Sequence, residues 1–410
     1  MKIPFNGYAT LAIPNAPKLC KRLAMMMALT LVSSASGFIM FHNIVQLIYY
    51  TACIVCFVYL LGGKDTHIEP KFLVFYALIG INVLILDIDP IFNSRIRAAF
   101  FILVTFTCSP FVVSERARLF RLYVFKYSII GFALLSIGSF FCYFLGINYM
   151  NQHVAGQLYN EAYINFQGVG GTFSGLTVQS MMLGPLSAMA AMLFLNEFQL
   201  HPKKIYIVLF IMASLSAFFA ASRGALLALV VPVIYSILLE RNKKIGLLVV
   251  IAMLAILPFA EFVLEGVINK NGGTEINIGS RQLKWDCRID EFKSSPLLGV
   301  GFSSIDPNGA DDFNRLTGQI EPGSSHLSVL SMLGGLGFFV YLIIVLTAFI
   351  RVRNSNNPNA GFLMCILLIY LVHLTFEGYI FGAGGMLCYV FWLVIGLCFD
   401  SRYKLDNLEV

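Results

Sequence analysis

Long apolar runs recur along the whole chain, and they constrain its fold more than any other feature of the sequence. A helix that crosses a bilayer needs about 20 mostly apolar residues. The sequence holds about twelve such runs, which predict an all-α integral membrane protein with about twelve transmembrane helices. The predicted spans are residues 23–41, 44–62, 72–88, 98–114, 127–147, 174–195, 205–221, 225–239, 245–264, 326–350, 361–376 and 383–399.

The composition agrees with this prediction. Charged residues make up 12% of the chain and hydrophobic residues 58%, whereas a soluble domain carries roughly 25% charged and about 45–50% apolar residues. These values exclude a soluble enzyme, a disordered protein and a nucleic-acid binder. We therefore expect residues 1–410 to form a single polytopic membrane domain. The first 22 residues contain no apolar core of secretory type, so we expect no cleaved signal peptide.

The distribution of Lys and Arg predicts the orientation, because cytoplasmic loops carry an excess of both. With the N-terminus inside, short external loops contain only Arg95, Arg97 and Arg223, and one long external loop contains six more cations. The other 19 of the 28 Lys and Arg residues then lie on the cytoplasmic side. Long segments translocate largely regardless of charge, so both termini are expected in the cytoplasm.

Two external segments stand out between the predicted spans. Residues 148–173 contain no Lys or Arg, and residues 265–325, between spans nine and ten, are the most charged stretch of the chain. We expect the second segment to be partly helical. The middles of the spans are nearly bare of charge, although ion and proton pathways usually place ionisable residues there. The sequence thus favours an enzyme at the external membrane face over an ion-coupled transporter.

The long external loop contains a helical pattern within residues 280–302. Arg281, Lys284 and Arg288 are spaced to share one helix face, with Trp285 beside them. Such a face can bind a phosphate or diphosphate, and arginine offers two hydrogen bonds at once. The same spacing fits a solvated helix whose own acidic residues are the counter-ions. The spacing alone does not decide between them.

Arg223 and His326 are the remaining polar candidates. Arg223 lies at the outer end of a span, where it could anchor lipid head groups or face a polar cavity. His326 opens a long apolar helix, capped by Ser324 or Ser325. The positive helix end favours a neutral histidine that can act as a base, and also suits an anion. A polar residue resting at the membrane interface explains His326 equally well.

The other sequence patterns indicate packing rather than chemistry. The glycines Gly334, Gly335 and Gly337 are expected to allow close helix packing. The six histidines and nine cysteines show no zinc-type spacing, and no glycine-rich nucleotide motif follows a strand. We therefore expect no metal and no cofactor.

Several motifs together resemble the O-antigen ligase/polymerase superfamily of bacterial membrane glycosyltransferases. They are an SRGA at the start of span eight, an R-x-x-x-W from Arg281 to Trp285, the sequence PLLGVGF at residues 296–302, and a histidine that opens a Gly-rich span. These motifs lie in order within residues 222–337, and the pattern of spans covers most of the chain. One departure is that Leu327 follows His326, where the family usually has Asn. The glycines after the histidine also fall three positions earlier than in the family pattern.

The resemblance implies transfer of a glycan from undecaprenyl diphosphate to an acceptor hydroxyl, at the periplasmic face of the bacterial inner membrane. By position, Arg223 and Arg281 would hold the diphosphate, and His326 would activate or orient the acceptor. We add Arg288 to the diphosphate site because it shares the helix face of Arg281. The candidate substrate contacts are Lys284, Trp285 and Glu321.

The acceptor distinguishes two activities within this superfamily. A polymerase extends a second lipid-linked repeat unit, whereas a ligase uses the lipid A core of lipopolysaccharide. The likeness of EPGSSHLSVLSMLGGLG to polymerase sequences favours a polymerase. Chain-length regulator and flippase proteins would be further partners. A flippase for lipid-linked oligosaccharides is the alternative from another class, and it would need polar residues at mid-depth.

Overall fold

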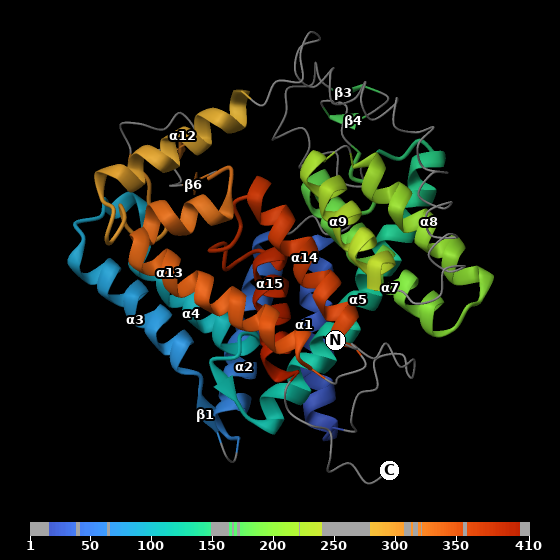
Figure 1. Ribbon diagram of the computed structural model, residues 1–410, viewed down its shortest axis with the longest axis horizontal. Helices are drawn as coiled ribbons and strands as arrows, with labels where there is room; N and C mark the ends of the chain where they lie inside the picture. The colour runs from blue at the N-terminus through green and yellow to red at the C-terminus, as the bar shows by residue number, and fades with distance from the viewer. Residues whose placement is uncertain are drawn as a thin grey trace.

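The computed structural model describes the parts of the chain that form its helical bundle (Figure 1). The described residues are 16–37, 42–63, 66–148, 164–165, 168–169, 173–220, 222–239, 279–306, 313–314, 319–320, 322–355 and 359–401. The helices are α1 (Lys18–Ala35), α2 (His42–Leu61), α3 (Pro70–Ile85), η1 (Pro90–Phe92), α4 (Ser94–Cys108), α5 (Glu115–Phe144), α7 (Ser180–Leu200), α8 (Lys204–Phe219), α9 (Arg223–Leu239), α12 (Gly279–Ser294), α13 (Ser325–Arg353), α14 (Ala360–Phe376) and α15 (Met386–Asp400).

Short strands form antiparallel pairs between some of these helices. The pairs are β1 (His67–Ile68) with β2 (Val112–Val113), β3 (Ile164–Asn165) with β4 (Gly168–Val169), and β5 (Phe313–Asn314) with β6 (Gln319–Ile320). In the first pair, His67 lies opposite Val113. The strands are two residues each, so the fold is predominantly helical.

The helices coincide with the predicted spans. Each predicted span contains a helix, except residues 245–264, which lie outside the described residues. Within the described residues, five helices are long and apolar enough to cross a membrane, and five more apolar helices are shorter. The prediction of a helical membrane protein is therefore confirmed. The total of twelve spans, and the place of the large loop between the ninth and the tenth, stay predictions.

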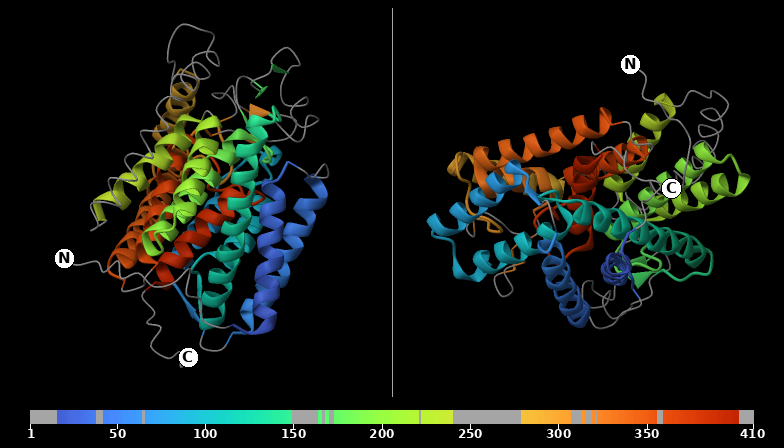
Figure 2. Two further views of the ribbon diagram at one scale, coloured as in Figure 1. Left: turned by 90° about the vertical axis from the view of Figure 1, so that its right-hand side faces the viewer. Right: turned by 90° about the horizontal axis from the view of Figure 1, so that it is seen from below.

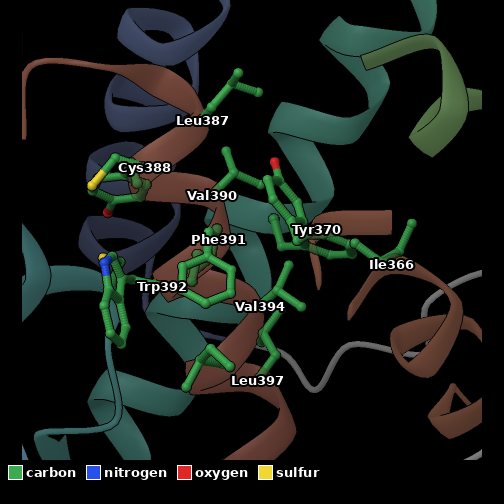
Figure 3. Close-up of a cluster of buried hydrophobic side chains, with 14 of the residues drawn as sticks. Ile366, Tyr370, Leu387, Cys388, Val390, Phe391, Trp392, Val394 and Leu397 are labelled. Carbon is green, nitrogen blue, oxygen red and sulfur yellow. The ribbon is translucent and has the colours of Figure 1, made fainter. Parts of the chain in front are cut away.

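Helix α15 lies in the middle of the bundle (Figure 1), and Figure 3 shows its side chains in a buried apolar cluster with Ile366 and Tyr370 of α14. Every residue from Met386 to Asp400 is buried, as expected for a helix that is apolar on all sides. Trp392 stacks its ring 5.8 Å from Phe75 of α3 and donates from Nε1 to the Ile380 carbonyl at 3.1 Å. Lipid is as apolar as these side chains, so close packing rather than the hydrophobic effect holds such helices together.

The remaining helices lie on two sides of α14 and α15. Figure 1 shows α7, α8 and α9 on one side and α3, α4 and α13 on the other, and Figure 2 agrees. Small and hydroxyl side chains allow the close approach on the first side. The Ser136 hydroxyl of α5 lies 2.9 Å from that of Ser187 in α7, and the Ser216 hydroxyl of α8 donates to the Ser136 carbonyl. Such contacts are typical of helix interfaces in membranes.

The two ends of the bundle differ. Helix α12 and strands β3, β4 and β6 lie at one end (Figure 1). At the other end, Arg121 of α5 forms two 2.8 Å hydrogen bonds with the carboxylate of Asp400, and Arg121 is completely buried. Nearby, Arg351 of α13 pairs with Glu69 at 3.0 Å. The described parts of both predicted external segments thus share one end of the bundle.

Helix α5 begins earlier than the predicted span at 127–147. It starts at Glu115, where the Ser114 hydroxyl caps it by accepting from the Ala117 amide at 3.1 Å. Charged residues that we expected in a cytoplasmic loop, Arg121 among them, therefore form its first turns. The prediction placed the start of the span where the sequence becomes apolar, whereas the helix itself begins earlier, at its capping residue.

Helix α13 is broken at Gly334, whose φ is +65°. The segment 296–302 lies against the break. In a regular helix the amides of residues 335 and 336 would donate to the carbonyls of residues 331 and 332. Here they donate instead to the Pro296 and Leu297 carbonyls, and the amides of Val300 and Gly301 donate to the two freed carbonyls. Gly334 thus interrupts the helix instead of only allowing close packing.

Candidate functional site

Helix α12 is the helix that the sequence predicted in the long external loop. Arg281 lies in its first turn, and Lys284 and Trp285 follow one turn later. Lys284 and Trp285 are both half-buried. Lys284 and Trp285 pack against the chain just before α13.

The contacts of α12 are made with Gly323 and Phe376. Trp285 donates from Nε1 to the Gly323 carbonyl at 3.2 Å, and its ring centroid lies 6.3 Å from that of Phe376. Gly323 has a φ of +72°, and a Cβ there would come within 2.8 Å of the Lys284 Cβ. The stem of Lys284 therefore covers Gly323, a position that favours glycine.

Phe376 is also the contact between this region and α9. Gly224 directly follows Arg223, the first residue of α9, and a Cβ on Gly224 would come within 2.9 Å of the Phe376 Cβ. Phe376 thus touches both the start of α9 and the Trp285 ring of α12. The structure brings the backbone positions of Arg223 and Arg281 to the same end of α14.

The start of α13 belongs to the same region. Ser324 caps α13, and its hydroxyl accepts from the Leu327 amide at 3.4 Å, so the expected position of His326 in the first turn is confirmed. The Ser325 hydroxyl donates to the Glu377 carbonyl at 2.6 Å and accepts from the Tyr379 amide at 3.0 Å. These bonds fix His326 beside the end of α14.

The imidazole of His326 has hydrogen bonds at both nitrogens. Nε2 lies 3.0 Å from the Leu371 carbonyl, and Nδ1 lies 2.9 Å from the Tyr341 hydroxyl. A carbonyl only accepts, so Nε2 carries a proton. In the neutral ring, Nδ1 then accepts from Tyr341. This arrangement holds the ring between α13 and α14.

Arg288 has a different environment from the one its spacing suggested. It is 3% exposed and pairs with Glu291 at 2.7 Å. Glu291 also accepts from the Asp306 amide at 3.0 Å. Burial raises the pKa of Glu291 above its ordinary value, although the nearby Arg288 cation acts against the shift. Arg288 therefore has an acidic residue of its own helix as a counter-ion, as the alternative expected, but it is buried rather than solvated.

Glu321 lies outside the described residues. In the part of the chain that the structure describes, no three His, Cys, Asp or Glu side chains are grouped so that they could hold a metal.

Sequence reasoning missed Phe376 and Tyr341, which contact this region. It also missed Asn82 of α3, whose side chain bonds the backbone of Leu298 and Phe302 after α12. Asn82 was the detectable one, because it is the only carboxamide in the apolar run 72–88. Polar side chains are rare inside spans and usually have a partner there. Phe376 carries no sequence signal, since it is one phenylalanine among 37.

The fold and these contacts define a polytopic helical membrane protein with a charged helix seated over the ends of its apolar helices. Residues 207–345, about a third of the chain, match the family model described as O-antigen ligase. This match confirms the resemblance to the O-antigen ligase/polymerase superfamily, whose members are glycosyltransferase-like enzymes. It includes Arg223, Arg281 and His326. No curated protein matches the chain.

Proposed function

We propose that this protein is a polysaccharide polymerase of the bacterial inner membrane. It transfers a glycan from undecaprenyl diphosphate to a second lipid-linked repeat unit at the periplasmic face. The observation that carries this proposal is the meeting of three segments around the end of α14. They are the start of α9 with Arg223, helix α12 with Arg281, and the start of α13 with His326.

The proposed chemistry needs cations at a leaving diphosphate. Arg223 and Arg281 bind the diphosphate and neutralise the charge that develops as the glycosidic bond breaks, which is usually the largest contribution to such catalysis. Arginine does this better than lysine because its planar group makes two hydrogen bonds to phosphate. We assign Arg288 to holding α12 in place, since its charge is already matched by Glu291. Lys284 and Trp285 join α12 to Gly323 beside the site.

The hydrogen bonds of His326 support a role in orienting the acceptor. For His326 to act as the base, Tyr341 must first release Nδ1, at a cost of about 1 kcal/mol for one hydrogen bond. Tyr341→Phe separates these roles. It should raise activity if the hydroxyl blocks the base, and lower it if the hydroxyl holds the ring in its working position.

An O-antigen ligase is the second candidate, because that is the description of the matching family model. A gene deletion examined on a surface-polysaccharide gel distinguishes the two activities. Loss of a polymerase should leave the lipid A core with one repeat unit and no ladder. Loss of a ligase should leave the core bare while long polymer accumulates on its lipid carrier.

Purified protein in liposomes with a labelled lipid-diphosphate donor tests the transfer itself. We expect new glycosidic bonds without ATP or an ion gradient, and movement of the donor between leaflets without such bonds would refute the proposal.

Arg223→Ala and Arg281→Ala should abolish transfer, whereas the Lys variants should retain part of it. Lys293→Ala is the matched control, because Lys293 also lies on α12 but is exposed and pairs with the exposed Asp290.

A further inference from the structure

Asn82 of α3 makes an unusual set of contacts with the segment 296–302. Its Nδ2 donates to the Leu298 carbonyl at 2.6 Å and to the Met332 carbonyl at 3.2 Å, and its Oδ1 accepts from the Phe302 amide at 2.6 Å. Asn82 is 2% exposed. One buried side chain of α3 thus bonds both the 296–302 segment and the broken part of α13.

These bonds satisfy backbone groups that regular secondary structure would otherwise pair. Irregular backbone among apolar helices is tolerated only where the protein itself provides the missing hydrogen bonds. The segment has little freedom for other reasons too. Gly299 has a φ of +76°, and a Cβ there would come within 2.4 Å of the Met332 carbonyl carbon. A carboxamide supplies both donors and an acceptor in one group, which no apolar side chain can do.

The segment held by Asn82 begins directly after α12. The Gly299 amide donates to the Ser295 carbonyl at 2.9 Å, and Ser295 follows the last residue of α12. Two further bonds attach α12 along its length. Trp285 donates to the Gly323 carbonyl, and Glu291, close to the 296–302 segment, accepts from the Asp306 amide. Arg281 lies beyond Trp285, on the side away from the 296–302 segment.

We propose that Asn82 is a positioning residue that sets where α12 presents Arg281 to the substrate. This inference rests on the proposed transferase function. At 1.5 Å per residue, the helix extends roughly 15 Å from Trp285 to Ser295 and roughly 6 Å from Trp285 to Arg281. If α12 pivots at Trp285, a 2–3 Å shift at its C-terminal end moves Arg281 by roughly 1 Å. A misplacement of about 1 Å at a reacting centre can lower the rate by about 10²-fold.

Cys287 offers a probe of α12 that does not depend on catalysis. It lies on α12 and is half-buried, whereas the other eight cysteines are buried. We expect Asn82→Leu to raise the rate at which a membrane-impermeant maleimide labels Cys287 severalfold. In the transfer assay, kcat should fall on the order of 10²-fold while KM for the lipid donor changes much less. Cys287→Ser confirms that labelling reports this residue.

Tyr76→Phe is the matched control. Tyr76 is a buried residue of the same α3, and its hydroxyl bonds Thr105 and Ser109 rather than the 296–302 segment. We expect Tyr76→Phe to leave both the labelling rate and kcat at wild-type values. Equal increases of labelling in Tyr76→Phe and Asn82→Leu would mean a general loosening of α3 and would overturn the proposal.

A second variant keeps the proposal testable if Asn82→Leu does not fold. Asn82→Asp keeps the size and the acceptor for Phe302, but turns an oxygen toward the Leu298 and Met332 carbonyls, so labelling should also rise. Wild-type labelling in either folded Asn82 variant would refute the positioning role. If wild-type protein forms no glycosidic bond while Asn82→Leu still exposes Cys287, the transferase proposal fails but Asn82 still positions α12.

Discussion

Replacing Gly334 by alanine should destabilise the protein strongly, because the break in α13 requires a residue without a side chain. The φ of +65° lies in the left-handed region, and an added Cβ would lie 2.3 Å from the Leu297 carbonyl oxygen. Backbone strain of this kind costs about 1–3 kcal/mol. Relieving the clash also means losing the bonds from the residue 335 and 336 amides to Pro296 and Leu297, at about 1 kcal/mol each. We expect a loss of about 3–5 kcal/mol in unfolding free energy.

The assay is heating of the detergent-solubilised protein followed by size-exclusion chromatography, which gives an apparent Tm. Gly80→Ala is the matched control, since a Cβ at Gly80 in α3 meets nothing within 4 Å. In a helix interior, alanine is favoured over glycine by about 1 kcal/mol, so Gly80→Ala should melt at or slightly above the wild-type temperature. If Gly334→Ala melted together with Gly80→Ala, the break would not depend on the glycine and the reasoning would be wrong.

Two further predictions concern buried charges. Arg121→Ala leaves Asp400 buried without its ion-pair partner and should cost about 3–5 kcal/mol, measured as a lower yield of monodisperse protein and a lower Tm. The double variant Arg121→Met, Asp400→Leu should recover most of that loss, and no recovery would contradict the explanation. Burial raises the pKa of Glu291 above its ordinary value of 4.5, so the folded protein binds the proton more tightly than the unfolded chain does. This proton contributes its full stability below pH 4.5, and the contribution is lost as pH rises through the raised pKa. Glu291→Gln removes this titration, so Tm should decline less steeply as pH rises above 4.5. The variant should also have a lower Tm overall, because Arg288 loses this carboxylate. An unchanged slope of Tm against pH would refute the assignment.

The sequence was sufficient to predict the elements whose causes are local. Apolar runs marked the helices, the spacing of Arg281 and Trp285 marked α12, and Ser324 marked the start of α13. The pairing of Arg288 with Glu291, three residues apart, was also within reach, since neighbours at that spacing face each other on a helix.

The remaining features depend on contacts between distant parts of the chain. The run 327–350, which contains Gly334, carries no charged residue and therefore predicts one continuous helix. Its break exists because segment 296–302 supplies replacement hydrogen bonds. Likewise, no local pattern connects Gly224, Trp285 and Phe376, whose contact assembles the candidate site.

The buried position of α15 has a consequence for the order of assembly. Helix α15 is translated after the helices that pack against it, which include α1, α3, α4, α5, α13 and α14. Until it arrives, those helices can only surround lipid or one another. Arg121 meets its carboxylate across a separation of 279 residues, so during synthesis this arginine needs a temporary partner, such as water or lipid phosphate at the membrane surface. The helices around α15 therefore reach their final packing only after it arrives, whereas α5, α7 and α8 can already bond one another through Ser136, Ser187 and Ser216.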